Sequence, residues 1–138
     1  MTEPLPESEE QRLRASFDRQ AMLATLGAEL VEISHGRAVL EMPSDPRFAQ
    51  QFGYTHAGAV TTLVDTACGY AALSTMGADR EVLTVDFTTN FVAPAAGARF
   101  RATATVLRPA GRSWSPGATC TPWTAPAGRS WWRRCRPP

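Results

Sequence analysis

The residue best placed to do chemistry in this sequence is a single carboxylate, Asp65. It is the only Asp, Glu, Lys or Arg between Arg47 and Asp79, and it lies within an apolar, helix-like run over residues 55–73. Burying a carboxylate without a local cation costs several kcal/mol, and Asp is about 0.7 kcal/mol worse than Ala inside a helix. A chain that tolerates both costs is expected to need this carboxylate for its function.

A second candidate group lies at the other end of the same helix-like run, which His56, Ala57 and Gly58 begin. The first N–H groups of a helix have no partner within the helix, and they can polarise an oxygen atom. Gly58 permits close approach of the backbone to a ligand or to a partner helix. His56 either holds the preceding loop to the start of the helix, which we favour, or contacts a substrate.

The same residues also have plainer interpretations. Asp65 could instead hydrogen-bond a neighbouring backbone group or pair with an Arg from elsewhere in the chain. Thr84 could hydrogen-bond on the Asp65 side of a site or could be an ordinary strand residue. The two histidines, His35 and His56, lie 21 residues apart, which is not the spacing of a ligand set. We therefore expect neither a metal nor another cofactor.

Hydrophobic periodicity predicts the elements that position these residues. Helical spacing of apolar residues predicts one helix from about residue 9 to 26 and a central helix from about residue 57 to 76, with Gly77 as its C-cap. Apolar runs and alternation predict strands over residues 30–33, 38–42, 82–92 and 99–108, the first two joined by a turn at His35-Gly36.

Composition limits the classes of function. A chain of 138 residues with 43% hydrophobic residues can bury one real core, so we expect one domain. A net charge of +1 gives no reason to expect nucleic acid or a membrane surface as partner. No apolar stretch reaches the roughly 20 residues of a membrane span. Residues 1–10 are acidic and lack the apolar region of a signal peptide, which favours a cytoplasmic protein.

The sequence changes character at Ser113. From there on it holds all four tryptophans, five of the eleven prolines, and four arginines without an acid, a charge of +4 against −3 for residues 1–112. Four tryptophans do not suit a disordered tail. We interpret the stretch as the product of a frameshift near Arg112, because back-translation in another frame allows an alternating strand. The prediction is a domain over 1–112 and an aberrant or disordered tail over 113–138 that forms no closing strands.

The motif around the two candidate groups resembles a known family. A helix, a hairpin, a long helix of small residues and long antiparallel strands follow one another in the order of the hotdog fold. The acyl-CoA thioesterases of the phenylacetate-pathway (PaaI-type) hotdog family resemble this chain at Phe52-Gly53-Tyr54-Thr55-His56-Ala57-Gly58-Ala59-Val60, at Leu63-Val64-Asp65, at Leu83-Thr84-Val85-Asp86-Phe87 and at Asn90-Phe91-Val92-Ala93-Pro94-Ala95. The resemblance covers roughly residues 20–112.

The resemblance implies an α+β hotdog fold, with a long central helix wrapped by an antiparallel sheet, and a homodimer or homotetramer whose substrate is an acyl-CoA. It implies an active site at the subunit interface, where the Ala57 N–H faces the thioester carbonyl. Asp65 arrives there from the partner subunit as general base or nucleophile, and Gln50 is the positional match to a polar residue that assists. His56, Gly58 and Thr84 are the expected substrate-binding residues. If the frame is shifted, the last strands of the sheet are missing.

Three other functions compete with thioester hydrolysis. Hotdog hydratases and dehydratases pair an Asp with a catalytic His a few residues away, whereas His56 lies nine residues before Asp65. A non-catalytic acyl-CoA-binding module would keep the pocket but would not need the carboxylate. An inactive truncated product would follow from a frameshift, because the lost strands would leave unpaired sheet edges and an exposed core.

Overall fold

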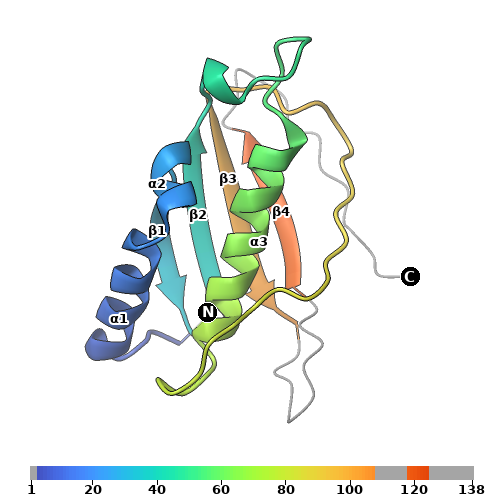
Figure 1. Ribbon diagram of the computed structural model, residues 1–138. Coiled ribbons are helices and arrows are strands. Elements are labelled where there is room, and N and C mark those ends of the chain that lie inside the picture. Colours follow the sequence, from blue (N-terminus) through green and yellow to red (C-terminus); the bar gives the residue numbers. More distant parts are fainter. Residues whose placement is uncertain (1–2, 108–117, 125–138) are drawn as a thin grey trace.

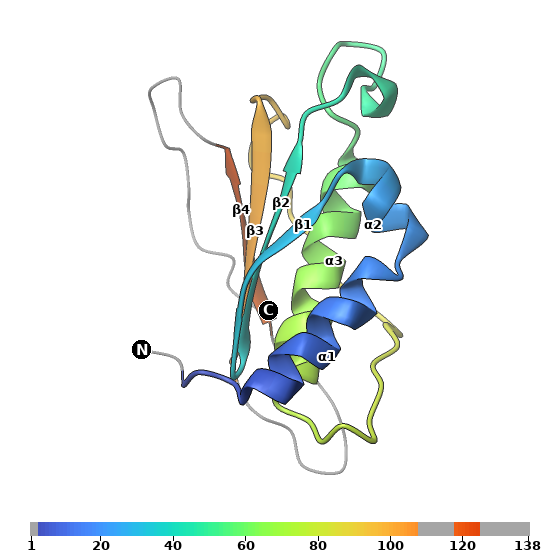
Figure 2. The same cartoon turned by 90° about the vertical axis from the view of Figure 1, so that its left-hand side faces the viewer.

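The computed structural model describes residues 3–107 and the backbone of residues 118–124, and these residues form two layers. Four strands make one antiparallel sheet in the order β1-β2-β3-β4. The described α-helices lie on the same face of that sheet, and α3 (Ala57–Leu73) runs along its middle strands (Figures 1 and 2). This is the α+β arrangement of a central helix against an antiparallel sheet that the sequence predicts.

The sheet begins with a tight hairpin of β1 (Glu29–Ser34) and β2 (Arg37–Pro43), within two residues of the predicted bounds. Gly36 has a φ of 72°, a left-handed conformation that glycine adopts without strain, so the predicted turn is confirmed. β2 then pairs along its whole length with β3 (Arg99–Val106).

The side chains on the two sides of β3 show which side of the sheet packs against the helices and which side carries ion pairs. Phe100, Ala102 and Ala104 are buried against the helices, as the predicted alternation requires. On the opposite face, Arg101 pairs with Glu32 at 3.0 Å and with Glu41 at 3.2 Å. The sheet is therefore apolar toward α3 and covered by ion pairs on its outer face.

The first predicted helix is in fact two helices, α1 (Glu7–Asp18) and α2 (Ala21–Leu26), so the prediction of one helix over 9–26 is wrong. The backbone leaves the helical conformation at Gln20, whose side-chain amide donates to the Tyr70 hydroxyl at 3.1 Å. That hydroxyl in turn donates to Ser16 at 3.2 Å. Each of the two short helices buries two apolar side chains, Leu13 and Phe17 in α1 and Leu23 and Leu26 in α2.

Helix α3 ends at Leu73, three residues earlier than predicted, and its C-cap is Ser74 rather than Gly77. The buried Ser74 hydroxyl donates to the Ala71 carbonyl at 2.8 Å and accepts from the Gly36 N–H at 2.8 Å. The end of α3 is thus fixed by a bond to the β1–β2 turn, a long-range contact that local sequence signals do not encode.

Residues 82–92 form no strand in the structure, so that prediction is wrong. Leu83 is 89% exposed and Val85 is 96% exposed, although the alternation that suggested a strand is real. A strand needs a hydrogen-bonded neighbour, and this segment finds none among the described residues. It runs instead alongside α3 before joining β3 (Figure 1).

The tail differs from its prediction in one respect. β4 (Ala118–Thr124) pairs with β3 in register from Phe100 to Val106, although residues 113–138 were expected to form no closing strand. Among the described strands, β4 lies at the edge of the sheet, where the missing ladder donor of Pro122 costs least. Residues 108–117 and 125–138 lie outside the described residues. None of the described helices is long and apolar enough to cross a membrane.

Candidate active site at the start of helix α3

One N–H group in the first turn of α3 has no hydrogen-bond acceptor among the described residues. The Gly58 N–H donates to the Nδ1 of His56 at 2.9 Å. The N–H groups of Ala59 and Val60 donate to the His56 carbonyl at 3.0 and 3.4 Å. The Ala57 N–H has no acceptor among the described residues, and Ala57 is exposed. A free, accessible donor at the positive end of a helix is suited to bind a carbonyl oxygen or an oxyanion.

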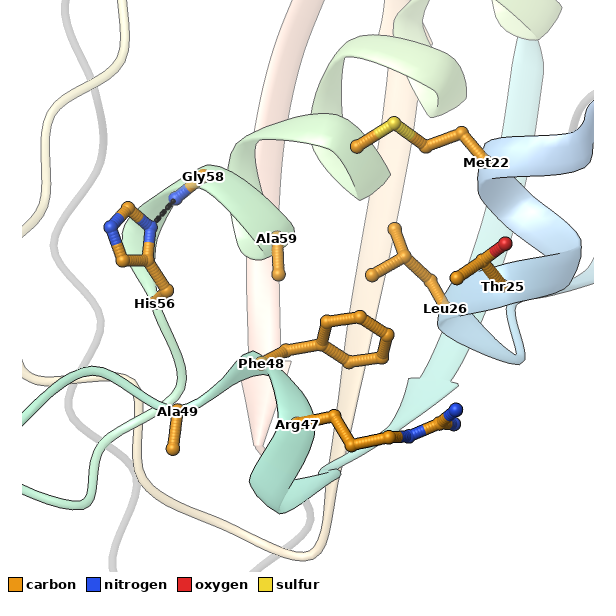
Figure 3. Close-up of a pocket in the computed structure, with 9 residues that line it drawn as sticks. All are labelled: Met22, Thr25, Leu26, Arg47, Phe48, Ala49, His56, Gly58 and Ala59. Carbon is orange, nitrogen blue, oxygen red and sulfur yellow. Dashed lines mark hydrogen bonds between the residues drawn. The ribbon is translucent and has the colours of Figure 1, made fainter.

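His56 is the N-cap of α3, which agrees with the structural role favoured from the sequence. Its backbone N–H donates to the Phe48 carbonyl at 2.7 Å, so the preceding loop is tied to the helix start. Because Nδ1 accepts the Gly58 N–H, the neutral ring carries its proton on Nε2 (Figure 3). No described residue accepts a bond from that N–H, so it could donate to a substrate, the alternative role considered for this residue.

Asp65 lies two turns further along α3 and is half-buried rather than buried, so the burial expected from the sequence is wrong for the single chain. Its Oδ1 accepts a hydrogen bond from the Thr84 hydroxyl at 2.8 Å. Thr84 belongs to the unpaired segment beside α3 and is exposed. The structure thus joins these two predicted residues, which are 19 positions apart in the sequence. A hydrogen bond on the Asp65 side was one of the two interpretations of Thr84 considered from the sequence.

The Ala57 N–H and the Asp65 carboxylate do not meet within one chain. Eight residues of α-helix separate them, which corresponds to about 12 Å along the helix axis. A thioester carbonyl bound at Ala57 would therefore lie out of reach of the same chain's Asp65. This separation is the geometry that a site shared between two subunits would require.

Gln50 lies in the loop before α3, and its side chain makes one hydrogen bond within that loop. Ala49 and Thr55 form an antiparallel bridge, and the Gln50 side-chain oxygen accepts the Phe52 N–H. No acceptor for its amide nitrogen is found among the described residues. Within the described part of the chain, no hydrogen bond joins Gln50 to Ala57 or Asp65, so the structure leaves its predicted role as a hypothesis.

An open cleft of about 440 Å³ adjoins the start of α3, and it was not predicted from the sequence. It lies between α2, the short 3₁₀ helix η1 (Pro46–Phe48) and the first turn of α3 (Figure 3). Its lining residues are Met22, Thr25, Leu26, Arg47, Phe48, Ala49, His56, Gly58 and Ala59. Met22 stands out among these residues, because it is an apolar side chain that is 58% exposed.

Comparisons with a family model and with solved structures connect this geometry to known proteins. Residues 52–115 match the model of the thioesterase superfamily. A thioesterase family protein from Silicibacter pomeroyi is 44% identical, with a TM-score of 0.76 over 84% of each chain. The E. coli PaaI protein from the phenylacetic acid degradation operon is 25% identical, with a TM-score of 0.69 over 78% of this chain and 76% of that one. These similarities confirm the predicted hotdog fold.

Two curated relatives are matched over shorter stretches. A stretch of 54 residues is 43% identical to ComA2 of Bacillus subtilis, and it spans 39% of this chain and 43% of ComA2, less than half of that relative's length. The 1,4-dihydroxy-2-naphthoyl-CoA hydrolase of Listeria monocytogenes is 28% identical over 83 residues, which are 60% of this chain and 68% of that protein.

Proposed function

Because the chain belongs to the thioesterase superfamily, we propose that it hydrolyses an acyl-CoA thioester to a free acid and CoA. The observation that carries the proposal is the Ala57 N–H, the one donor in the first turn of α3 that has no acceptor among the described residues. Such a donor stabilises the negative charge that develops on the carbonyl oxygen in the transition state. The Listeria relative, named as a naphthoyl-CoA hydrolase, supports acyl-CoA as the substrate class.

Asp65 supplies the second half of the chemistry. Its carboxylate either takes a proton from the attacking water or itself attacks the carbonyl carbon to give an anhydride that water then hydrolyses. In both routes the C–S bond breaks and CoA leaves as a thiol after gaining a proton. Thr84, donating to Oδ1, fixes the orientation of the carboxylate and leaves Oδ2 for the reaction. Gln50 would donate its free amide N–H to the same substrate oxygen as Ala57.

The active unit is at least a homodimer, and a homotetramer is compatible with the same site. The separation along α3 means that a single thioester needs Ala57 from one subunit and Asp65 from the other. The segment over 82–92 supports this view, because it exposes the apolar side chains of Leu83 and Val85 and has no strand partner among the described residues, and a second copy could supply both a cover and a partner. Cytoplasmic location is part of the proposal, since cytoplasmic acyl-CoA would be the substrate.

The division into a domain over 1–112 and a frameshifted tail over 113–138 also remains a proposal. The superfamily match ends at residue 115, close to Arg112, which supports it. The pairing of β4 with β3 counts against it, because a shifted frame is not expected to give a strand in register. The nucleotide sequence around Arg112 decides the question: an uninterrupted frame that continues in close homologous genes would remove the hypothesis.

The test of the proposed function is the release of free thiol from a panel of short, medium, long-chain and aryl acyl-CoAs. Asp65→Asn should lower hydrolysis at least about 100-fold, the usual scale for loss of a general base, with an unchanged circular dichroism spectrum. Asp86→Asn is the matched control, because Asp86 is exposed on the segment that carries Thr84 and should leave the rate unchanged. Near-normal turnover by a well-folded Asp65→Asn protein would contradict the assignment.

The same panel separates the two alternatives. The unpaired 82–92 segment is the observation that favours an inactive or purely binding chain, because an incomplete sheet can hold a ligand without turning it over. Wild-type protein that binds acyl-CoA but releases no thiol would indicate a non-catalytic acyl-CoA-binding module. Protein that neither binds nor hydrolyses any acyl-CoA would indicate an inactive truncated product.

A further inference from the structure

The cleft beside α3 has an apolar floor and one adjustable wall. Leu26, Phe48 and Ala59 point toward one another at its base, and Leu26 and Ala59 are 3% and 7% exposed (Figure 3). Met22 extends from α2 toward α3 above them and is 58% exposed. A thioether side chain without branching adapts to ligands of different shape. The cleft is therefore built to cover an apolar group, with Met22 setting its free length.

The polar side chains that line the cleft already make hydrogen bonds within the chain, although no described residue accepts a bond from the Nε2–H of His56. The Thr25 hydroxyl donates to the Ala21 carbonyl at 2.8 Å. Arg47 donates from Nε and Nη2 to Asp45 at 3.0 and 2.7 Å, and this hydrogen bonding lowers the pKa of the Asp45 carboxyl. The Nδ1 of His56 is used by Gly58. An occupant would therefore meet mainly carbon atoms, which favours an apolar ligand over a polar one.

The cleft is also continuous with the reacting position. His56 and Gly58 both line it, and the free N–H of Ala57 lies between them in the chain. A thioester carbonyl bound to that N–H extends in two directions, one apolar toward its acyl group and one toward the amides and phosphates of CoA. Only the acyl direction matches an apolar cleft whose cation is already paired.

We infer that this cleft holds the acyl group of the substrate and that Met22 is a specificity-determining residue, so the preferred substrate carries a bulky apolar acyl group rather than acetyl. The inference rests on the proposed function, because it places a thioester carbonyl at Ala57. Each methylene that the cleft buries raises kcat/KM about fourfold, equivalent to ~0.8 kcal/mol. The rate constant kcat/KM thus rises steeply from acetyl-CoA to hexanoyl-CoA and levels off once the cleft is full.

The test compares Met22→Trp with Val31→Trp on acetyl-, butyryl-, hexanoyl-, octanoyl- and phenylacetyl-CoA. Val31 is the matched control, since it is a 40% exposed apolar residue on β1 that does not line the cleft. Met22→Trp fills the cleft and should lower the ratio of kcat/KM for octanoyl-CoA over acetyl-CoA at least about tenfold, whereas Val31→Trp leaves the ratio unchanged. Met22→Ala, which lengthens the cleft, should shift the optimum toward longer chains and serves if the Trp variant fails to fold.

The outcomes distinguish this inference from the function on which it rests. An equal loss on every acyl-CoA would mean that the cleft holds the pantetheine arm, and an unchanged ratio in a folded Met22→Trp protein would mean that it holds no part of the substrate; both overturn the inference while hydrolysis stands. Wild-type protein that hydrolyses none of the five thioesters overturns the proposed function, and the inference with it.

Discussion

The start of α3 and the segment that follows α3 contribute the two halves of the proposed site in opposite ways. At the helix start, three kinds of hydrogen bond fix the backbone around His56: its ring accepts the Gly58 N–H, its N–H donates to Phe48, and its carbonyl accepts two N–H groups of the helix. They leave the Ala57 N–H exposed. Two turns further along α3, Asp65 is bonded by Thr84, which belongs to the segment over 82–92. That segment has no strand partner among the described residues and exposes Leu83 almost completely. One half of the site is thus complete in a single chain, while the other depends on a segment that still lacks its neighbour.

The difference teaches that the oxyanion-binding half can be tested by local changes, whereas the carboxylate half needs tests that report on assembly. Backbone donors at a helix start need no further partner to be positioned. A hydrogen bond from an exposed segment persists only if that segment is held. We therefore expect substitutions at the helix start to change rates without changing the oligomeric state.

The largest effect is expected from Ala57→Pro. Proline lacks the N–H yet is favoured at the first position of a helix, and the ψ of 137° at His56 suits the residue before a proline. Loss of an oxyanion donor lowers kcat about 100- to 1,000-fold. Steady-state kinetics with thermal unfolding measures it, and Ala57→Gly, which keeps the N–H, is the control. A folded Ala57→Pro enzyme with ordinary kcat would show that this donor does not bind the carbonyl oxygen.

Mixing two inactive variants tests the shared site directly. A heterodimer of Asp65→Asn and Ala57→Pro subunits has one site with both groups intact, so equal mixing should restore about a quarter of the wild-type activity. Subunit exchange by refolding together, followed by thiol release, measures the recovery, and each variant refolded alone is the control. If native mass spectrometry detects heterodimers and activity stays at the level of the single variants, each site is built within one chain.

Thr84→Val should have a smaller effect, a loss of about tenfold in kcat, because it removes a positioning hydrogen bond and not a reacting group. Thr84→Ser keeps the hydroxyl and should retain most of the rate. Separate values of kcat and KM add a readout that a merely structural residue would not move: kcat should fall in Thr84→Val while KM stays close to wild type, because the hydrogen bond orients the Asp65 carboxylate and does not hold the substrate. An unchanged kcat in a folded Thr84→Val protein would make Thr84 an ordinary surface residue.

The sequence predicted those parts of the fold and site that depend on local signals. The start of α3 at Ala57, the Gly36 turn and the alternation in β3 all follow from neighbouring residues, and the structure has them. The pairing of Thr84 with Asp65 was anticipated only as one of two possibilities.

The missed features depend on distant contacts. The helix break at Gln20 is stabilised by Tyr70, which is 50 residues away, and the early end of α3 by Gly36. The cleft results from the position of α2 that this break allows. The strand predicted over 82–92 fails for the same kind of reason, since alternation specifies a face to bury but not the neighbour that would complete the ladder.

The smallest effect is expected at His56. His56→Ala removes the side-chain acceptor of the Gly58 N–H, so it should destabilise the protein by about 1 kcal/mol, the usual cost of losing an N-cap. His56→Asn, which can still accept that bond, should recover most of the loss; thermal unfolding measures both. Kinetics on the same proteins decides between the two roles left open by the sequence. A cap alone leaves KM close to wild type in His56→Asn, whereas a substrate contact through Nε2 raises KM in both variants, because neither carries that donor at the position of the ring.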